Sequence, residues 1–185
     1  GTLPSNLALC VNPEYDYIQI KDKTRNNQLF IILEKRLSQI LPAINKKDIT
    51  DEKRAEMYEI VKRYKGRDLM GLKYKPLFNY FVDECPNAFR VLGDSYVTEE
   101  GGTGIVHQAP AFGEDDNRIC VANGVVGKTD MPCPVDANGR FTDQVPDWKG
   151  INVKDADNDI CATLKANGRL LLKESYVHSY PFCWR

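Results

Sequence analysis

The 185-residue sequence contains only two histidines, and none of its six cysteines forms a CxxC pair with another. The cysteines are Cys10, Cys85, Cys120, Cys133, Cys161 and Cys183. Because a structural zinc site takes four Cys or His ligands at short spacings, this scatter argues against bound zinc, and we expect no metal and no cofactor. Several cysteines have apolar neighbours, which is typical of reduced core thiols and favours a cytoplasmic protein over a disulfide framework.

Long apolar runs and an excess of one charge are also missing. No segment approaches the roughly 18 apolar residues that would indicate a membrane span, and no signal peptide is visible, so we expect no membrane association. The formal net charge of −1 excludes a generally cationic nucleic-acid binder. A local basic patch occurs at residues 46–67, but acids are interleaved with its lysines and arginines. A solvated helix with ordinary ion pairs is the simpler interpretation of this patch.

The first third of the chain predicts a hairpin followed by two helices. Runs rich in aromatic and β-branched residues at 15–21 and 28–33 flank a polar turn, which indicates two paired strands. Apolar residues at helical spacing predict one helix over residues 33–41. A second helix is predicted from the N-cap Thr50 to Gly66. We expect residues 34–67 to form a polar, peripheral helical insertion.

The remainder predicts short strands with two inserted helices. Strands are expected at residues 69–74, 89–92, 95–98, 103–107 and 170–180, helices at 113–122 and 153–166, and a hairpin at 135–142 around Asn138-Gly139. A chain of this length is able to bury one core, so residues 1–185 are predicted to be a single domain. The pattern predicts an α+β fold with a closed or nearly closed, barrel-like sheet core and peripheral helices.

The most informative segment is residues 102–116, GTGIVHQAPAFGEDD. Its glycines allow a close approach of the backbone, and Ile105 and Val106 are typical of the end of a buried strand. Pro110 stops that strand, and the acids that follow favour the first turn of a helix. A strand end, a turn and a helix start commonly bring polar groups to the mouth of a pocket, which makes His107 and Asp116 candidate site residues.

This segment resembles the editing-site signature of isoleucyl-tRNA synthetases, a GTG(I/A)VHxAP run closed by two aspartates. Residues 2–6 (TLPSN) resemble the tail of the threonine-rich strand that leads into the family's editing domain. Residues 178–185 (HSYPFCWR) resemble the strand that returns to the aminoacylation core. Residues 58–59, 65–69 and 74–78 (YKPLF) are similar to the eukaryotic cytosolic enzymes. The resemblance spans the chain and implies a cytoplasmic editing domain excised from a larger synthetase.

The resemblance implies post-transfer editing: a positioned water hydrolyses valyl-tRNA(Ile) in a pocket that admits valine and excludes isoleucine. Valyl-adenylate remains open as a second substrate. Asp116 is expected to bind the substrate's α-ammonium group, although an acid at this position also stabilises a helix N-terminus. Asn6 is expected to hold the water or the ester oxygen. Further substrate contacts are expected from Thr2, Gly104, Ala109 and Phe112.

Three roles are open for His107: a steric wall against isoleucine, a contact to the terminal ribose, and a general base for the water. Positioning and exclusion are favoured, since no serine or cysteine beside it suggests a covalent nucleophile. The second histidine, His178, lies in an alternating segment and is interpreted as structural. Gly1 stands where the family has tryptophan and looks like a cloning scar. The family's preceding threonines are absent, so we expect weak or no hydrolysis by this chain alone.

The expected partners are the acceptor end of tRNA(Ile) carrying valine and the remainder of the synthetase, with the chain itself a monomer. One alternative is the editing domain of a valyl- or leucyl-type synthetase. Those domains generally replace the histidine of the motif and do not keep the stretch at residues 109–113. Another alternative is a non-catalytic module that binds the acceptor end of tRNA through residues 46–67.

Overall fold

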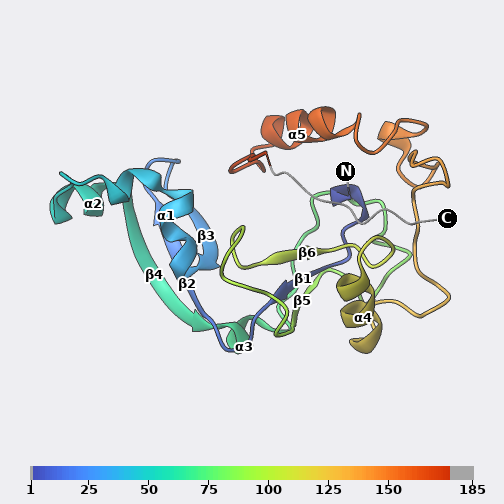
Figure 1. Ribbon diagram of the computed structural model, residues 1–185, viewed down its shortest axis with the longest axis horizontal. Helices are drawn as coiled ribbons and strands as arrows, with labels where there is room; N and C mark the ends of the chain where they lie inside the picture. Colours follow the sequence, from blue (N-terminus) through green and yellow to red (C-terminus); the bar gives the residue numbers. More distant parts are fainter. Residues whose placement is uncertain (1, 176–185) are drawn as a thin grey trace, which may run out of the picture.

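The computed structural model describes residues 2–175 and contains two separate three-stranded sheets (Figure 1). In the first sheet β1 (Ala8–Val11) is central. It pairs in parallel with β5 (Arg90–Gly93) and antiparallel with β6 (Val106–Gln108). The β1–β6 register sets Leu9 opposite His107. Because side chains alternate along a strand, these two residues share one face of the sheet.

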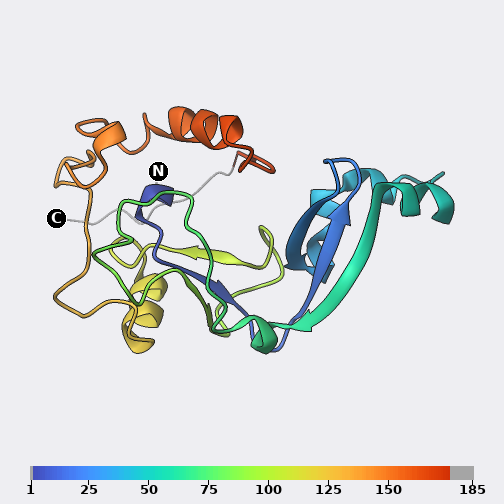
Figure 2. The same cartoon turned by 180° about the vertical axis from the view of Figure 1, so that it is seen from behind.

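The second sheet is entirely antiparallel. Its central strand β2 (Asp16–Asp22) lies between β3 (Gln28–Leu33) and β4 (Tyr58–Lys65). The hairpin predicted from residues 15–33 is therefore confirmed. Isoleucines of β2 and β3 pack against the short helical segment that follows β3, and together they bury a small core. This unit projects to one side of the first sheet (Figure 2).

Short helical elements surround both sheets. The α-helices are α1 (Leu37–Ile40), α2 (Asp51–Met57), α3 (Gly66–Leu69), α4 (Glu114–Ala122) and α5 (Asp157–Ala166), and the 3₁₀ turns are η1 (Leu3–Ser5), η2 (Glu34–Arg36), η3 (Pro42–Asn45) and η4 (Pro146–Trp148). In the described part of the chain, no helix has the length and apolar character that crossing a bilayer requires.

Helices α4 and α5 lie on opposite sides of the first sheet (Figure 1). From α4, Ile119 and Cys120 enter the main core, which also contains Ala8 and Cys10 of β1. From α5, Ile160 and Leu164 face inward, as predicted, and pack in a separate core with Trp148. The face of the sheet that carries Leu9 and His107 is thus the face that α4 does not cover.

The predicted barrel is wrong, because residues 2–175 form two open sheets and no closed barrel. The strand expected at residues 69–74 contributes only an isolated bridge, Lys73 to Arg90, and residues 95–98 form no strand. The hairpin expected at residues 135–142 is present as a tight turn closed by the single bridge Val135 to Phe141. A barrel needs a continuous ladder without free edges, and these segments are too short and turn-rich to supply one. Residues 170–175 form no strand, and residues 176–180, like His178, lie outside the described residues.

The helix predicted over residues 50–66 is also wrong in its second half. Thr50 caps α2 as expected, since its hydroxyl accepts the Lys53 N–H. The helix ends at Met57, and the next eight residues form β4. Tyr58 and Ile60 pack on the core of the second sheet. Aromatic and β-branched side chains favour a strand, and pairing with β2 supplies the backbone hydrogen bonds of this segment.

Helix α4 confirms the start predicted at Gly113, which is its N-cap, and Asn123-Gly124 ends it. Helix α5 begins later than predicted, at Asp157. The short strand predicted at residues 89–92 is present as β5. Strand β6 covers the end of the run predicted at residues 103–107. Local capping and turn signals thus proved more reliable than strand signals.

The hydroxyl of Tyr17 joins the two sheets. It donates to the Gly104 carbonyl at 2.6 Å and accepts the Asn12 N–H at 3.0 Å, and the side chain is fully buried. Tyr17 packs there with Val11 of the first sheet. A buried hydroxyl that serves two backbone groups fixes how the segment before β6 approaches β2.

We therefore expect Tyr17→Phe to lower the free energy of unfolding by about 1–3 kcal/mol, because both backbone groups lose their partner inside the protein. Urea denaturation measures the change. Tyr15→Phe is the matched control, since Tyr15 is half-buried in the same cluster and its hydroxyl has no hydrogen-bond partner among residues 2–175. Equal stability of the two variants would contradict a joining role for Tyr17.

Candidate functional site

A cavity of about 420 Å³ opens on the face of the first sheet that carries His107 and that α4 does not cover. Its base is formed by His107 and Leu9, and its walls come from η1, the β2–β3 hairpin, the segment before β5 and the segment after α5. The lining residues are Leu3, Asn6, Leu9, Arg25, Gln28, Leu29, Phe30, Tyr74, Lys75, Leu77, His107, Gly168, Arg169, Leu170 and Leu171. None of them is acidic. The volume is typical of small-molecule sites, which occupy about 300–1,000 Å³.

A hydrogen-bonded chain crosses the base of the cavity. The Asn6 amide Nδ2 lies 2.8 Å from Nδ1 of His107 and donates to the Ala8 carbonyl at 2.9 Å. The Tyr74 hydroxyl donates to Asn6 Oδ1 at 2.5 Å. On the other side of the imidazole, Nε2 lies 3.2 Å from the Thr2 hydroxyl. Three residues predicted for the site, Thr2, Asn6 and His107, are therefore brought together.

Burial lowers the pKa of His107 from its ordinary 6.5 to about 4. The imidazole is consequently neutral at physiological pH. Three cations, Arg25, Lys75 and Arg169, also line the cavity.

Two of these cations, Lys75 and Arg169, are exposed and have no acidic partner within residues 2–175. The third, Arg25, pairs at 2.5 Å with Asp22, which is fully buried. Burial alone would raise the pKa of Asp22, but hydrogen bonds from Thr24 and Arg25 hold it below its ordinary value. Asp22 thus anchors Arg25 at the cavity edge.

The basic span at residues 46–67 has a different character. Several of its cations are already paired with acids, among them Arg54 with Asp51 and Arg63 with Glu34. These cations pair on the surface of the second sheet and do not line the cavity. The solvated, ion-paired interpretation of this span agrees with these contacts.

Asp116 lies in the first turn of α4 and does not line the cavity. Its Oδ2 accepts the Ala109 N–H at 2.8 Å. Burial raises the pKa of Asp116, although its backbone hydrogen bonds oppose the shift. No described residue provides it with a cationic partner. In the free protein, Asp116 closes the turn between β6 and α4.

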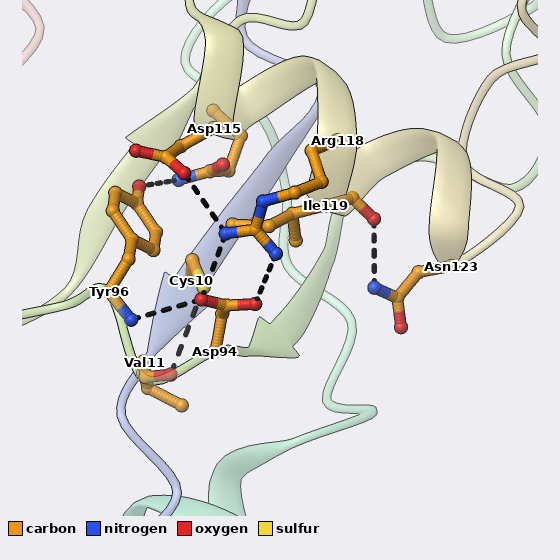
Figure 3. A network of polar contacts seen from close by, with 9 residues as sticks. Cys10, Val11, Asp94, Tyr96, Asp115, Arg118, Ile119 and Asn123 are labelled. Carbon is orange, nitrogen blue, oxygen red and sulfur yellow. Dashed lines mark hydrogen bonds and ion pairs between the residues drawn. The ribbon is translucent and has the colours of Figure 1, made fainter.

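The first turn of α4 is held by an ion-pair network on the side opposite the cavity. Figure 3 shows Arg118 reaching from α4 between Asp94 and Asp115. Its guanidinium contacts both oxygens of Asp94, at 2.9 and 3.1 Å, and Asp115 at 3.0 Å. These bonds hold the pKa of Asp94 below its ordinary value. Buried Gln108 contacts Tyr96 on the same side, at 2.7 Å.

The other predicted site residues are structural or peripheral in the free protein. Gly104 is buried with φ +75°, and a Cβ there would meet Leu33 at 2.5 Å. Ala109 is buried and Phe112 is 38% exposed, and neither lines the cavity. Within residues 2–175, no group of three or more His, Cys, Asp or Glu side chains is arranged to hold a metal.

Sequence reasoning missed most of the cavity wall. Tyr74, Lys75 and Leu77 belong to the YKPLF segment, which had carried only a family resemblance. A tyrosine and a lysine beside a helix-breaking proline were the available signal. Arg25 and Arg169 follow turn residues and carried no motif at all. Their approach to His107 depends on how distant segments pack.

Comparison with known proteins finds similarity along the whole chain. No family model matches the chain. Over its full length the chain is 52% identical to the cytoplasmic isoleucine–tRNA ligase of Mus musculus, 50% identical to that of Saccharomyces cerevisiae, and 43% identical to that of Arabidopsis thaliana. The whole chain matches one segment of isoleucyl-tRNA synthetases. It spans 14–17% of the length of these three relatives.

A solved structure agrees with the fold of this chain. The crystal structure of GlLeuRS-CP1 is similar with a TM-score of 0.61, over 98% of this chain and 81% of that one. At 16% sequence identity this similarity establishes the fold alone. The chain thus shares the α+β fold of that structure, and its chemistry must be argued from its own residues.

The low pKa of His107 has a consequence for stability. In the unfolded chain the imidazole takes up a proton near pH 6.5, whereas in the folded protein it does so only near pH 4. The unfolded state therefore binds more protons between these values, and stability falls as the pH drops through this window. We expect the loss to reach up to about 3 kcal/mol.

Replacing His107 by Gln should remove this part of the acid sensitivity. Urea denaturation between pH 7 and pH 4 measures it, with His178→Gln present in both proteins so that only one histidine titrates. The same pH slope with and without His107 would show that its pKa is not lowered by folding.

Proposed function

We propose that this chain is the editing domain of an isoleucyl-tRNA synthetase and that, within the complete enzyme, it hydrolyses valyl-tRNA(Ile). The observation that carries the proposal is the Thr2–His107–Asn6 chain at the base of a ligand-sized cavity. The relatives are isoleucine–tRNA ligases, which supports tRNA(Ile) as the tRNA of the proposed substrate. They are named cytoplasmic, and we propose the same location for this chain.

The need for such a site follows from the limits of size recognition. An aminoacylation pocket shaped for isoleucine gains only about 1–3 kcal/mol over valine from one methylene, a limit for which isoleucyl-tRNA synthetases are the standard example. A second pocket that admits valine and excludes isoleucine removes the remaining errors. The cavity is large enough for a terminal adenosine together with a valyl group, and its apolar walls suit both.

The residues at the base have complementary proposed roles. His107 limits the space at the bottom of the cavity, and Asn6 orients the imidazole ring of His107. The Thr2 hydroxyl lies 3.2 Å from Nε2 of His107 and is the proposed second contact of the attacking water. Gly104, Ala109 and Phe112 remain proposed contacts along the β6 to α4 turn.

Asp116 remains the proposed partner of the α-ammonium group. Its half-buried carboxylate has no cationic partner in the described chain and is destabilised by burial. An ammonium group brought to it would relieve that cost and form a charge-assisted bond. Since Asp116 does not line the cavity of the free protein, this role requires the turn after β6 to adjust when substrate binds.

Positive charge at the cavity mouth supports an RNA substrate. Lys75 and Arg169 are exposed there and have no acidic partner within residues 2–175, whereas several cations of the basic span at residues 46–67 are ion-paired. Phosphodiesters of the acceptor strand would meet these two side chains as the terminal nucleotide enters. This arrangement also favours the second candidate function, an acceptor-end binding module, but locates its contacts at the cavity instead of at residues 46–67.

In the complete synthetase carrying this segment, we expect Asn6→Ala and Asp116→Ala to leave isoleucine charging unchanged while valyl-tRNA accumulates roughly tenfold or more. Misacylation assays with valine measure the accumulation. Asp115→Ala is the matched control for Asp116, because Asp115 pairs with Arg118 on the far side of the sheet. If Asp116→Ala accumulates no more valyl-tRNA than the wild type, Asp116 does not belong to the site. If neither Asn6→Ala nor Asp116→Ala accumulates more than the wild type, the proposed editing function is refuted.

For RNA binding we expect Lys75→Gln together with Arg169→Gln to reduce the salt dependence of affinity. Loss of two phosphate contacts lowers the slope of log K against log salt by about 1.4, about 0.7 for each contact with a single strand. Fluorescence titration of a short single-stranded RNA ending in CCA gives the slope. Lys46→Gln together with Lys47→Gln is the control. A larger change of slope in this control pair would show that the RNA contacts lie in the basic span at residues 46–67.

A further inference from the structure

The amide of Asn6 has one orientation that its neighbours permit. The Ala8 carbonyl can only accept a hydrogen bond, so the group 2.9 Å from it must be the amide nitrogen. The amide oxygen then faces the Tyr74 hydroxyl, which donates to it at 2.5 Å. Burial raises the pKa of Tyr74, so its hydroxyl keeps the proton that it donates. The contacts of the amide nitrogen and of the amide oxygen therefore require the same orientation of the Asn6 side chain.

This orientation determines which nitrogen of His107 carries the proton. The second hydrogen of the Asn6 amide points to Nδ1, 2.8 Å away. Nδ1 must accept this bond and is therefore unprotonated. The neutral ring then carries its proton on Nε2, which lies 3.2 Å from the Thr2 hydroxyl. Adding a proton to Nδ1 would set two N–H groups against each other and break the chain.

We propose that His107 acts in the hydrolysis as a neutral hydrogen-bond donor through Nε2 and not as a general base, and that Tyr74 is a positioning residue that sets this state through Asn6. The inference rests on the proposed editing function. It excludes one of the three roles left open for His107, the general base. Nδ1, the nitrogen with a free lone pair in this tautomer, is occupied by the Asn6 amide. No basic nitrogen is left facing the cavity to take a proton from water.

The hydrolysis balances without a proton on His107. The oxygen of water bonds to the ester carbonyl carbon, and the bond from that carbon to the ribose oxygen breaks. One proton of the water passes to the ribose oxygen, and the resulting carboxylic acid releases its proton to solvent. When the Thr2 hydroxyl gives up its bond to Nε2–H, His107 donates this N–H to the oxygen on which negative charge develops, and the ring returns unchanged.

The surroundings of the ring keep it neutral. Leu9 lies opposite it in the sheet, and no lining residue of the cavity is acidic. The charged groups that face the cavity, Arg25 from the β2–β3 hairpin, Lys75 before β5 and Arg169 after α5, are all positive. A nearby carboxylate would stabilise the protonated ring that a general base forms, and the described lining of the cavity provides none.

Nuclear magnetic resonance of the ring nitrogens tests the tautomer directly. In the 185-residue chain with His178→Gln and ¹⁵N-labelled histidine, we expect long-range ¹H–¹⁵N correlations to show one tautomer at pH 7, protonated at Nε2. Because this measurement needs no substrate, it separates the inference from the proposed function. A proton on Nδ1 would overturn it whether or not valyl-tRNA is hydrolysed.

Two isosteric variants test the role of the hydrogen-bonded chain. Tyr74→Phe keeps the ring that packs edge-on against Phe89 at 6.0 Å but removes the donor. We expect it to give a mixture of tautomers. Asn6→Asp replaces the donor to Nδ1 by an acceptor and should reverse the tautomer and raise the pKa of His107. An unchanged Nε2-protonated ring in both variants would show that Asn6 and Tyr74 do not set its state.

Kinetics in the complete synthetase distinguish positioning from a structural role. We expect Tyr74→Phe to lower kcat for valyl-tRNA deacylation about tenfold with KM within about twofold, since the donor is misplaced and substrate binding is kept. Tyr80→Phe is the control, because the Tyr80 hydroxyl bonds to Asp147 away from the cavity. Equal kcat in Tyr74→Phe and wild type would refute the positioning role.

Discussion

The candidate site depends on the antiparallel pairing of β1 with β6. This pairing brings together Asn6 and His107, which are 101 positions apart in the sequence, and sets Leu9 opposite the imidazole. A shift of the register by one residue would turn His107 toward α4 and bring Gln108 to the cavity, since side chains alternate along a strand. Gln108 is fully buried on the α4 side and hydrogen-bonded to Tyr96, which helps to hold the register.

Much of the local structure could be predicted because its signals lie within a few residues of one another. The hairpin of β2 and β3, the cap at Thr50 and both ends of α4 followed from side chains and turns next to them. The GTGIVHQAP motif likewise located His107, and the TLPSN segment located Asn6. Both candidates came from the resemblance of short motifs, and the structure brings the two side chains together.

Features set by contacts between distant segments could not be predicted in this way. Strand β4 carries aromatic and β-branched residues that favour a strand but also match helical spacing, and pairing with β2 decides between the two. Tyr74 reaches Asn6 across 68 positions, and no local pattern reports that contact. Asp116 follows His107 closely in the sequence, yet the turn at Pro110 carries it into α4 and toward the Ala109 backbone.

Strand β4 also bears on how copies of this chain meet. As an outer strand of its sheet it has a row of backbone donors and acceptors with no neighbour on one side. Lys62, Arg63 and Lys65 line this strand and are exposed. A second copy adding its own β4 in register would bring like charges together, a common protection against edge-to-edge aggregation. Side chains within the basic span that suggested RNA contacts thus also place like charges along an open edge of the sheet.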